Sequence, residues 1–277
     1  MANQTLSVAL LSECFFGPGA EARLTERLAE AKRRGAEIVL LPELPLQEWR
    51  PWTKEARDED AESPGGPRET LLRNACRAAG IAAVGGVIRR DDSGRRESRV
   101  LLVDAGGELL TTYGKIHLPE EEGFWETSHY QASRDAPRPI DFLGFPIGFQ
   151  ICSDANRPEG CHLLGAQGAQ AILHPRATER ATWNRWHIVL RSNAITSASY
   201  VLSVNRPGPE FGVLMGGPSL AIDPRGEILT ETLEALAIVT LRRDRVAECK
   251  KLYPGYLAHF PDLYARTWAE IARQAKS

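Results

Sequence analysis

The stretch IGFQICSDANRPE, residues 147–159, passes from an apolar run into a polar turn and then reaches a proline. Short apolar runs bounded by Gly, Pro or Asp are typical of strands that are buried on at least one face. Proline suits the first position of a helix. The stretch therefore predicts a strand, a sharp turn and a helix, with Cys152 at the end of the strand. Such a bend exposes a side chain and places backbone N–H groups nearby.

Strand-like and helical patterns alternate along the rest of the chain. Apolar residues recur at helical spacing in four segments, and short apolar runs lie between them. The helical segments are 20–31 (ended by Gly35), 67–79, 158–168 and 183–194, and the runs are 6–11, 38–41, 81–88, 100–104, 147–152, 171–174, 200–205, 219–223 and 237–241. Two tight turns, Asp104–Gly107 and Asp223–Gly226, predict hairpins. We therefore expect an α/β layered fold with mixed sheets.

The composition excludes several classes of protein. The 277 residues are 43% hydrophobic and 25% charged, which is ordinary for a globular chain, and the formal net charge is −2. That charge gives no general reason to bind nucleic acid or an anionic membrane, and no apolar run is long enough to span one. The five cysteines show no CxxC spacing and the six histidines show no metal-ligand spacing. We expect a cytoplasmic protein without metal or cofactor.

Two long segments, 43–66 and 114–139, show no clear periodicity. Loops of this length inside a compact domain are usually functional or disordered. They are either solvated insertions or a pair of walls around a site.

Three polar residues each end an apolar run, which is where α/β sheets tend to hold ligands. Glu43, in LLPELPL, could act as a general base, or it could be a surface carboxylate. Lys115, in YGKIHL, could stabilise an oxyanion, or it could be solvated. Cys152 could be a nucleophile, and its thiolate would gain from Lys115 and from a helix N-terminus. We interpret His117 as a structural residue, and the other cysteines as core residues: Cys14, Cys76, Cys161 and Cys249.

The ordered set of LLPELPL, YGKIHL and CSDANRPE resembles the nitrilase superfamily of carbon–nitrogen hydrolases. That family carries a catalytic glutamate, lysine and cysteine in such segments. The resemblance continues through Asn205-Arg206, GGPS, IDPRGEIL and PGYLAHFPDLY. It implies a single domain over 1–277 with a four-layer αββα sandwich, a homodimer or larger homo-oligomer, and a tail (243–277) at the subunit interface. Glu126, in GFWETSHY, matches a second family glutamate.

The resemblance also implies a reaction. Cys152 would attack the carbonyl carbon of a small linear amide or N-carbamoyl compound while Glu43 takes the thiol proton. Lys115 and the backbone N–H of Ser153 would hold the oxyanion, and a thioester would form with release of ammonia or an amine. Ser153-Asp154 after the cysteine looks more like amidases and carbamoylases than like nitrilases. A true nitrilase and a non-catalytic binding protein with a hydrolase-like fold are the alternatives.

Departures from the family pattern lie close to the predicted site. Ser153 and Arg157 stand where the family commonly has aromatic residues, and Gly114 stands where it has arginine, which leaves the substrate open. Arg176 directly follows a predicted strand and could clamp a substrate carboxylate, or pair with Glu179 or another acidic residue. The predicted substrate-binding residues come from segments beside the strand ends: Trp49, Trp52, Trp125, Asn156, Arg157 and Arg176.

Overall fold

The structure is a computed structural model that describes residues 4–275, and it contains two six-stranded sheets. The first sheet has the order β14-β1-β2-β3-β4-β5. In this sheet β1, β2 and β3 are parallel, and the outer pairings are antiparallel. Its strands are β1 (Thr5–Leu11), β2 (Ile38–Leu40), β3 (Ala82–Arg90), β4 (Arg96–Val103), β5 (Leu109–Gly114) and β14 (Leu236–Arg242).

The two faces of the first sheet belong to different parts of the core. Val8 and Leu10 face the second sheet, whereas Ala9 and Leu11 face a helical layer. This division follows from the two-residue period of a strand. The helical layer consists of α1 (Ala20–Arg33) and α2 (Pro67–Ala79). Leu24 of α1 is fully buried, which contributes roughly 1.5–3 kcal/mol.

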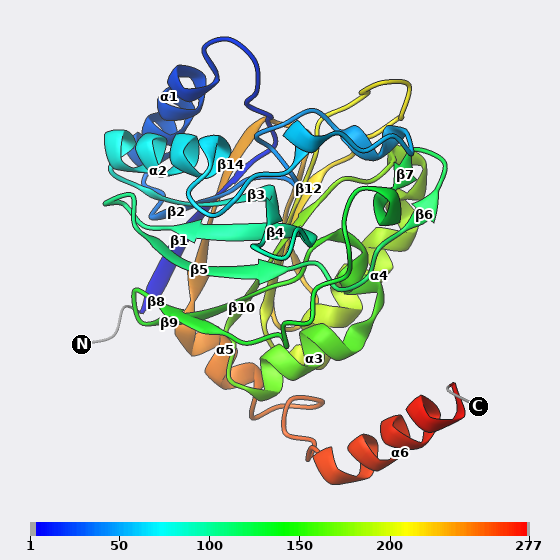
Figure 1. Cartoon of the computed structure of the whole chain (residues 1–277). Helices are drawn as coiled ribbons and strands as arrows, with labels where there is room; N and C mark the ends of the chain where they lie inside the picture. The colour runs from blue at the N-terminus through cyan, green and yellow to red at the C-terminus, as the bar shows by residue number, and fades with distance from the viewer. Residues whose placement is uncertain (1–3, 276–277) are drawn as a thin grey trace.

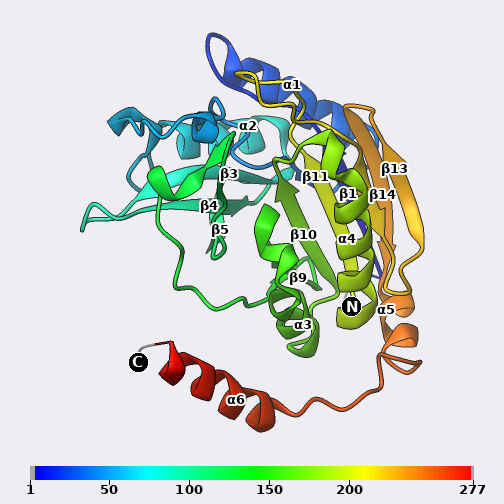
Figure 2. The same cartoon turned by 90° about the vertical axis from the view of Figure 1, so that its right-hand side faces the viewer.

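The second sheet has the order β13-β12-β11-β10-β9-β8. Its outer face is covered by two helices, α3 (Pro158–Ala166) and α4 (Trp183–Ser197). Figure 2 shows these helices beside β9, β10 and β11, away from α1 and α2. Its strands are β8 (Ile140–Phe142), β9 (Phe145–Phe149), β10 (Ala171–Arg176), β11 (Tyr200–Asn205), β12 (Ser219–Ile222) and β13 (Ile228–Thr232).

The four layers are thus helices, sheet, sheet and helices, as expected for an αββα sandwich with mixed sheets (Figures 1 and 2). The chain builds the first sheet, then the second, and returns to the first with β14. Both predicted hairpins are confirmed, because β4 pairs antiparallel with β5 and β12 with β13.

The structure corrects the expected strand ends. β9 ends at Phe149, so Cys152 does not lie in the strand but begins the 3₁₀ turn η4 (Cys152–Asn156). The side chain of Asp154 accepts a hydrogen bond from the N–H of Ile151 at 3.1 Å, which helps to turn the backbone away from the sheet. β10, in contrast, is longer than predicted and includes Arg176.

The two long irregular segments contain short elements. Segment 43–66 forms the 3₁₀ turns η1 (Arg50–Trp52) and η2 (Asp58–Asp60). Segment 114–139 forms the small hairpin β6 (Glu120–Glu121) and β7 (Phe124–Trp125), then the 3₁₀ turn η3 (Glu126–Ser128).

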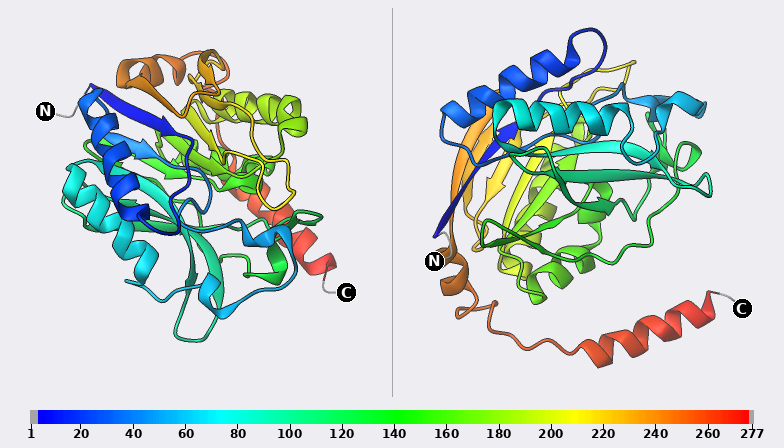
Figure 3. Two further views of the ribbon diagram at one scale, coloured as in Figure 1. Left: turned by 90° about the horizontal axis from the view of Figure 1, so that it is seen from above. Right: turned by 60° about the vertical axis from the view of Figure 1, so that its left-hand side comes forward.

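The C-terminal segment divides into two parts. α5 (Arg243–Cys249) packs on the body, since Val246 and Cys249 are buried. α6 (Pro261–Gln274) stands away from the body (Figures 1 and 3), and it has no buried residue. Among the helices of residues 4–275, none is long and apolar enough to cross a membrane.

Candidate active site

Cys152 occupies a strained position at the start of η4. Its φ of 45° lies in the left-handed region, which residues other than glycine rarely adopt. Such strain persists only where the surroundings enforce it, and it is frequent at functional sites. The Sγ atom donates to the carbonyl oxygen of Ala177 at 3.5 Å, and the side chain is buried. The turn, rather than the strand itself, presents the thiol.

Lys115 lies between two glutamates that come from different segments. Its Nζ donates to Oε1 of Glu43 at 2.8 Å and to the two carboxylate oxygens of Glu126 at 2.7 and 2.6 Å. Glu43 follows β2, Lys115 follows β5 and Glu126 begins η3. All three side chains are at most 1% exposed. The structure therefore brings together the predicted Glu43, Lys115 and Glu126.

Burial and charge set the protonation of this cluster. Burial lowers the pKa of Lys115, but the negative charges of Glu126 and Glu43 outweigh burial and raise it above the ordinary value. Burial also raises the pKa of the Glu126 carboxyl, which lies in the same cluster. The pKa of the Cys152 thiol is raised by burial and then by the charge of Glu43, although Lys115 opposes both. The raised pKa favours the thiol form of the resting Cys152, so the sulfur needs a base to take its proton.

Glu43 keeps one oxygen free. Its Oε1 accepts from Lys115, whereas its buried Oε2 has no hydrogen-bond partner within the described part of the chain. An unpaired carboxylate oxygen in a buried site is able to accept a proton.

Asp154 joins the cysteine turn to the lysine segment. Its Oδ1 accepts from the N–H groups of Ile116 and His117 at 3.1 and 2.8 Å, and its Oδ2 accepts from the Tyr113 hydroxyl at 3.0 Å. The His117 ring contacts Asp154 at 3.0 Å, which agrees with a structural role. Sequence reasoning used Asp154 only in the Ser153-Asp154 pair that favoured amidases, and it did not predict that this side chain joins the two segments.

Arg206 was a second omission. Its guanidinium is fully buried and donates to the carbonyl oxygens of Glu43 and Leu44 at 3.1 and 2.6 Å. It also pairs with Glu210 at 2.6 Å. Arg206 thereby fixes the loop that carries Glu43. The sequence feature that could have identified Arg206 is its place in the Asn205-Arg206 segment, which belongs to the family resemblance.

An apolar cluster lies beside the site. It shares Ala177 with the surroundings of Cys152, and it includes Trp49. Trp49 is fully buried and donates from Nε1 to the carbonyl of Gly123 at 2.8 Å. Trp52 stacks on Phe211 with ring centroids 5.5 Å apart. The cluster consists of Leu44, Trp49, Ala61, Ile88, Phe124, Tyr130, Ala177, Val213 and Met215.

The other predicted substrate residues lie in different surroundings. Trp125 is half-buried under the ammonium of Lys54, 3.9 Å from the ring centroid. Asn156 and Arg157 are exposed at the end of η4, so the structure does not bring them to the buried cluster.

Arg176 is buried but does not pair with Glu179. Its Nε donates to Ser203 Oγ at 2.9 Å, and its other nitrogens donate to Thr178 and to the carbonyl of Pro218. The guanidinium also lies over the ring of Trp183, 5.1 Å from the centroid. Within residues 4–275 no ion pair reaches it; a clamp on a substrate carboxylate stays a prediction.

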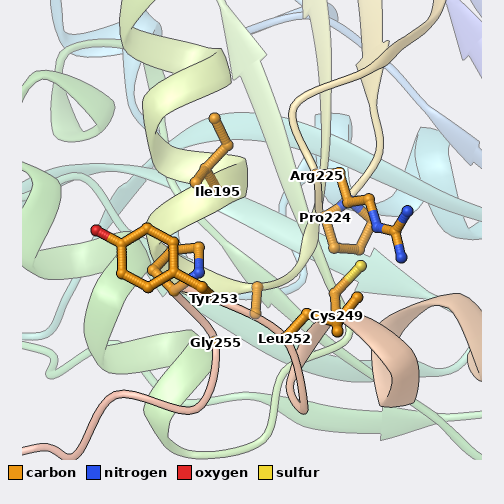
Figure 4. A pocket seen from close by; sticks show the side chains of 9 residues that line it. Ile195, Pro224, Arg225, Cys249, Leu252, Tyr253 and Gly255 are labelled. Atoms are coloured by element: carbon orange, nitrogen blue, oxygen red, sulfur yellow. The ribbon is translucent and has the colours of Figure 1, made fainter.

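The described residues offer no metal centre, and the hollow drawn in Figure 4 lies away from the cluster. The described residues include no group of three or more His, Cys, Asp or Glu side chains arranged to hold a metal ion. A hollow of about 210 Å³ lies elsewhere, between the end of α4, the β12–β13 turn and the segment after α5 (Figure 4). Its lining includes Ile195, Pro224 and Tyr253, and none of the catalytic candidates.

Comparison with known proteins agrees with this architecture. The carbon–nitrogen hydrolase family model matches residues 21–251. A protein of Pseudomonas protegens, "Hydrolase in pqqF 5'region", is 31% identical over 83% of this chain and 80% of its own length. Human omega-amidase NIT2 is 27% identical over 86% of this chain and 88% of its own. A Helicobacter pylori carbon–nitrogen hydrolase has a TM-score of 0.81 at 17% identity, covering 95% and 98% of the two chains. The chain belongs to the carbon–nitrogen hydrolase family, within the nitrilase superfamily.

Proposed function

We propose that this hydrolase cleaves small linear amides or N-carbamoyl compounds, with Cys152 as nucleophile and a thioester as intermediate. The observation that carries the proposal is that the two carboxylate oxygens of Glu43 have different surroundings. Lys115 engages Oε1, and Oε2 stays unpaired in a buried site. A carboxylate held by one oxygen can move protons with the other.

The first half of the reaction forms the thioester. Oε2 of Glu43 takes the thiol proton while Sγ bonds to the carbonyl carbon and the carbonyl electron pair moves to oxygen. Lys115 and the N–H of Ser153 stabilise that oxyanion. When the intermediate collapses, the carbon–nitrogen bond breaks, and Glu43 gives its proton to the leaving nitrogen.

The second half releases the acid. Glu43 takes a proton from water, and the water oxygen bonds to the thioester carbon. Collapse then breaks the carbon–sulfur bond, and the thiolate recovers a proton from Glu43. Every group returns to its starting state. The raised pKa of the Cys152 thiol suits this cycle, because the sulfur needs a base before it attacks.

The linear-amide class rests on Ser153-Asp154 after the cysteine and on the human relative named as an omega-amidase. The same residues could add the thiol to a nitrile, which is the alternative reaction. The free-thiol requirement of Cys152 suits a reducing compartment, so we also propose a cytoplasmic location.

An ammonia-release screen tests the function. The panel consists of short aliphatic amides, ω-amides of dicarboxylic acids, N-carbamoyl amino acids and the matching nitriles. We expect release from amides or N-carbamoyl compounds and not from nitriles. Release from nitriles alone would identify a nitrilase, and no release from any compound would favour a binding protein.

Two cysteine variants test the nucleophile. Cys152→Ala should lose turnover while staying folded. Cys76→Ala is the matched control, because Cys76 is equally buried but lies in α2, in the core between the helices and the first sheet. It should keep turnover. A Cys152→Ala protein with near-normal activity would refute the assignment. With the wild-type enzyme, mass spectrometry of a rapidly quenched reaction should detect the acyl group on Cys152.

We also propose that residues 1–277 form one domain whose tail contacts a second copy. Within the predicted tail, 243–277, we propose α6 as the part that makes this contact, because α5 packs on the body of its own chain. Tyr264, Trp268 and Ile271 recur at steps of four and three along α6 and are exposed. Such a stripe on a helix is typical of an interface.

A further inference from the structure

A chain of hydrogen bonds connects Arg176 to the backbone of the proposed nucleophile. Arg176 Nε lies 2.9 Å from Ser203 Oγ, Ser203 Oγ lies 2.8 Å from His174 Nδ1, and His174 Nε2 lies 2.9 Å from the carbonyl oxygen of Cys152. His174 and Ser203 are direct partners on β10 and β11. All of these side chains are at most 1% exposed.

The chemistry of the groups fixes the direction of each bond. A carbonyl oxygen only accepts, so His174 Nε2 must carry the hydrogen. In the neutral ring Nδ1 then accepts, which makes the Ser203 hydroxyl a donor. The Ser203 oxygen in turn accepts from Arg176, whose guanidinium only donates. Burial and the charge of Arg176 lower the pKa of His174 to about 4, so the ring is neutral near pH 7.

The end of this chain is a peptide group that the reaction uses. The carbonyl of Cys152 and the N–H of Ser153 belong to the same peptide. Donation to a peptide oxygen polarises the group and strengthens its N–H as a donor. No hydrogen bond between described residues uses the Ser153 N–H, so it is available to a substrate oxygen. The same series of hydrogen bonds also holds the carbonyl of Cys152, the residue whose φ is 45°.

We propose that His174 is a positioning residue, which orients and polarises the Cys152–Ser153 peptide through the Arg176–Ser203–His174 hydrogen-bond chain. The inference rests on the proposed function, because it assigns a purpose to the Ser153 N–H as oxyanion donor. It also gives buried Arg176 a role that needs no substrate carboxylate. No proton is transferred along these hydrogen bonds during turnover.

Kinetics of four variants test the proposal. His174→Leu removes the donor, whereas His174→Gln supplies an amide N–H at the position of Nε2. Ser203→Ala breaks the connection to Arg176 and leaves the His174 donor. Ser199→Ala is the matched control, because Ser199 is also fully buried but bonds to the carbonyls of Ala169 and Ser197.

We expect His174→Leu to lower kcat by about 10- to 100-fold with little change in KM, since an oxyanion donor acts mainly in the transition state. His174→Gln should recover most of that loss. Ser203→Ala should lower kcat by a few-fold, and Ser199→Ala should not. Equal losses in the Leu and Gln variants, or a change confined to KM, would overturn the proposal.

A spectroscopic measurement separates this proposal from the proposed function. The ¹⁵N spectrum of histidine-labelled wild-type protein near pH 7 should show His174 with hydrogen on Nε2 alone. Ser203→Ala should shift the Nδ1 resonance, because that nitrogen loses its donor. A hydrogen on Nδ1 would contradict the chain even if amidase activity were confirmed. If no amide were hydrolysed, the proposed function would fail, and its oxyanion role with it.

Discussion

The ammonium of Lys115 lies 2.8 Å from Oε1 of Glu43, and both side chains are almost completely removed from solvent. Glu126 lies on the same ammonium, so one cation serves two carboxylates. Charges buried in this way are tolerated only when they are paired. The catalytic candidates are therefore also a structural unit, and both roles can be measured.

Lys115→Met should destabilise the protein and abolish turnover. The substitution leaves two carboxylates together without a cation, and breaking a buried pair costs about 3–5 kcal/mol. Urea unfolding measures this change. Adding Glu43→Gln and Glu126→Gln to Lys115→Met should recover most of the stability but no activity. Lys251→Met, at an exposed lysine, is the control. If the triple variant stayed as unstable as the single one, lost packing rather than unpaired charge would be the cause.

Glu43→Gln should lower the pKa of the Cys152 thiol while it stops hydrolysis. The charge of Glu43 raises that pKa, so its removal makes the thiolate easier to form. The far-ultraviolet absorbance of the thiolate reports the change in a pH titration, with Cys152→Ala subtracted as the background. A titration that moves to higher pH would show that Glu43 does not act on Cys152 through its charge.

His174 should make the protein less stable in weak acid. Its pKa in the folded state is about 4, below the ordinary 6.5, because of burial and the positive charges of Arg176 and Lys115. The hydrogen bond to the Cys152 carbonyl and the charge of Asp154 partly oppose this shift. Between these values the unfolded chain binds a proton that the folded chain does not bind. Stability from this group is complete above about pH 6.5 and is lost as the pH falls towards 4, up to about 3 kcal/mol in total.

The free energy of unfolding of the wild type and of His174→Gln, measured from about pH 7 to about pH 4.5, checks this expectation. The wild-type curve should fall more steeply, because glutamine does not titrate. Parallel curves would mean that His174 has an ordinary pKa in the folded protein.

Removal of α6 should abolish self-association without unfolding the body. Residues of α6 are exposed, so a chain ending at Phe260 loses no buried core. Sedimentation of the full chain, the shortened chain and a Trp268→Glu variant measures the oligomeric state. We expect the full chain to be a dimer or larger and both variants to dissociate. A shortened chain that still associates would place the interface elsewhere.

The spacing of apolar residues along the sequence predicted many of the strands and helices. The apolar run at 6–11 alternates between two buried faces, and α1 begins at Ala20 as its four-residue spacing predicts. Periodicity works here because each element must bury one face or both. The pattern was less informative about strand ends: β9 ends at Phe149, before a turn in which Asp154 accepts a hydrogen bond from the N–H of Ile151.

By itself the sequence determined the alternation of the main strands and helices, because it depends on neighbours in the chain. Ordered motifs in the sequence also selected Glu43, Lys115 and Cys152, whose catalytic roles stay predictions. Only the tertiary structure decided which atoms meet. It put Glu126 on Lys115, left one oxygen of Glu43 free, and aligned His174 with the Cys152 carbonyl. The physical reason is that hydrogen bonds and pKa values depend on distance and burial, which packing between distant segments creates.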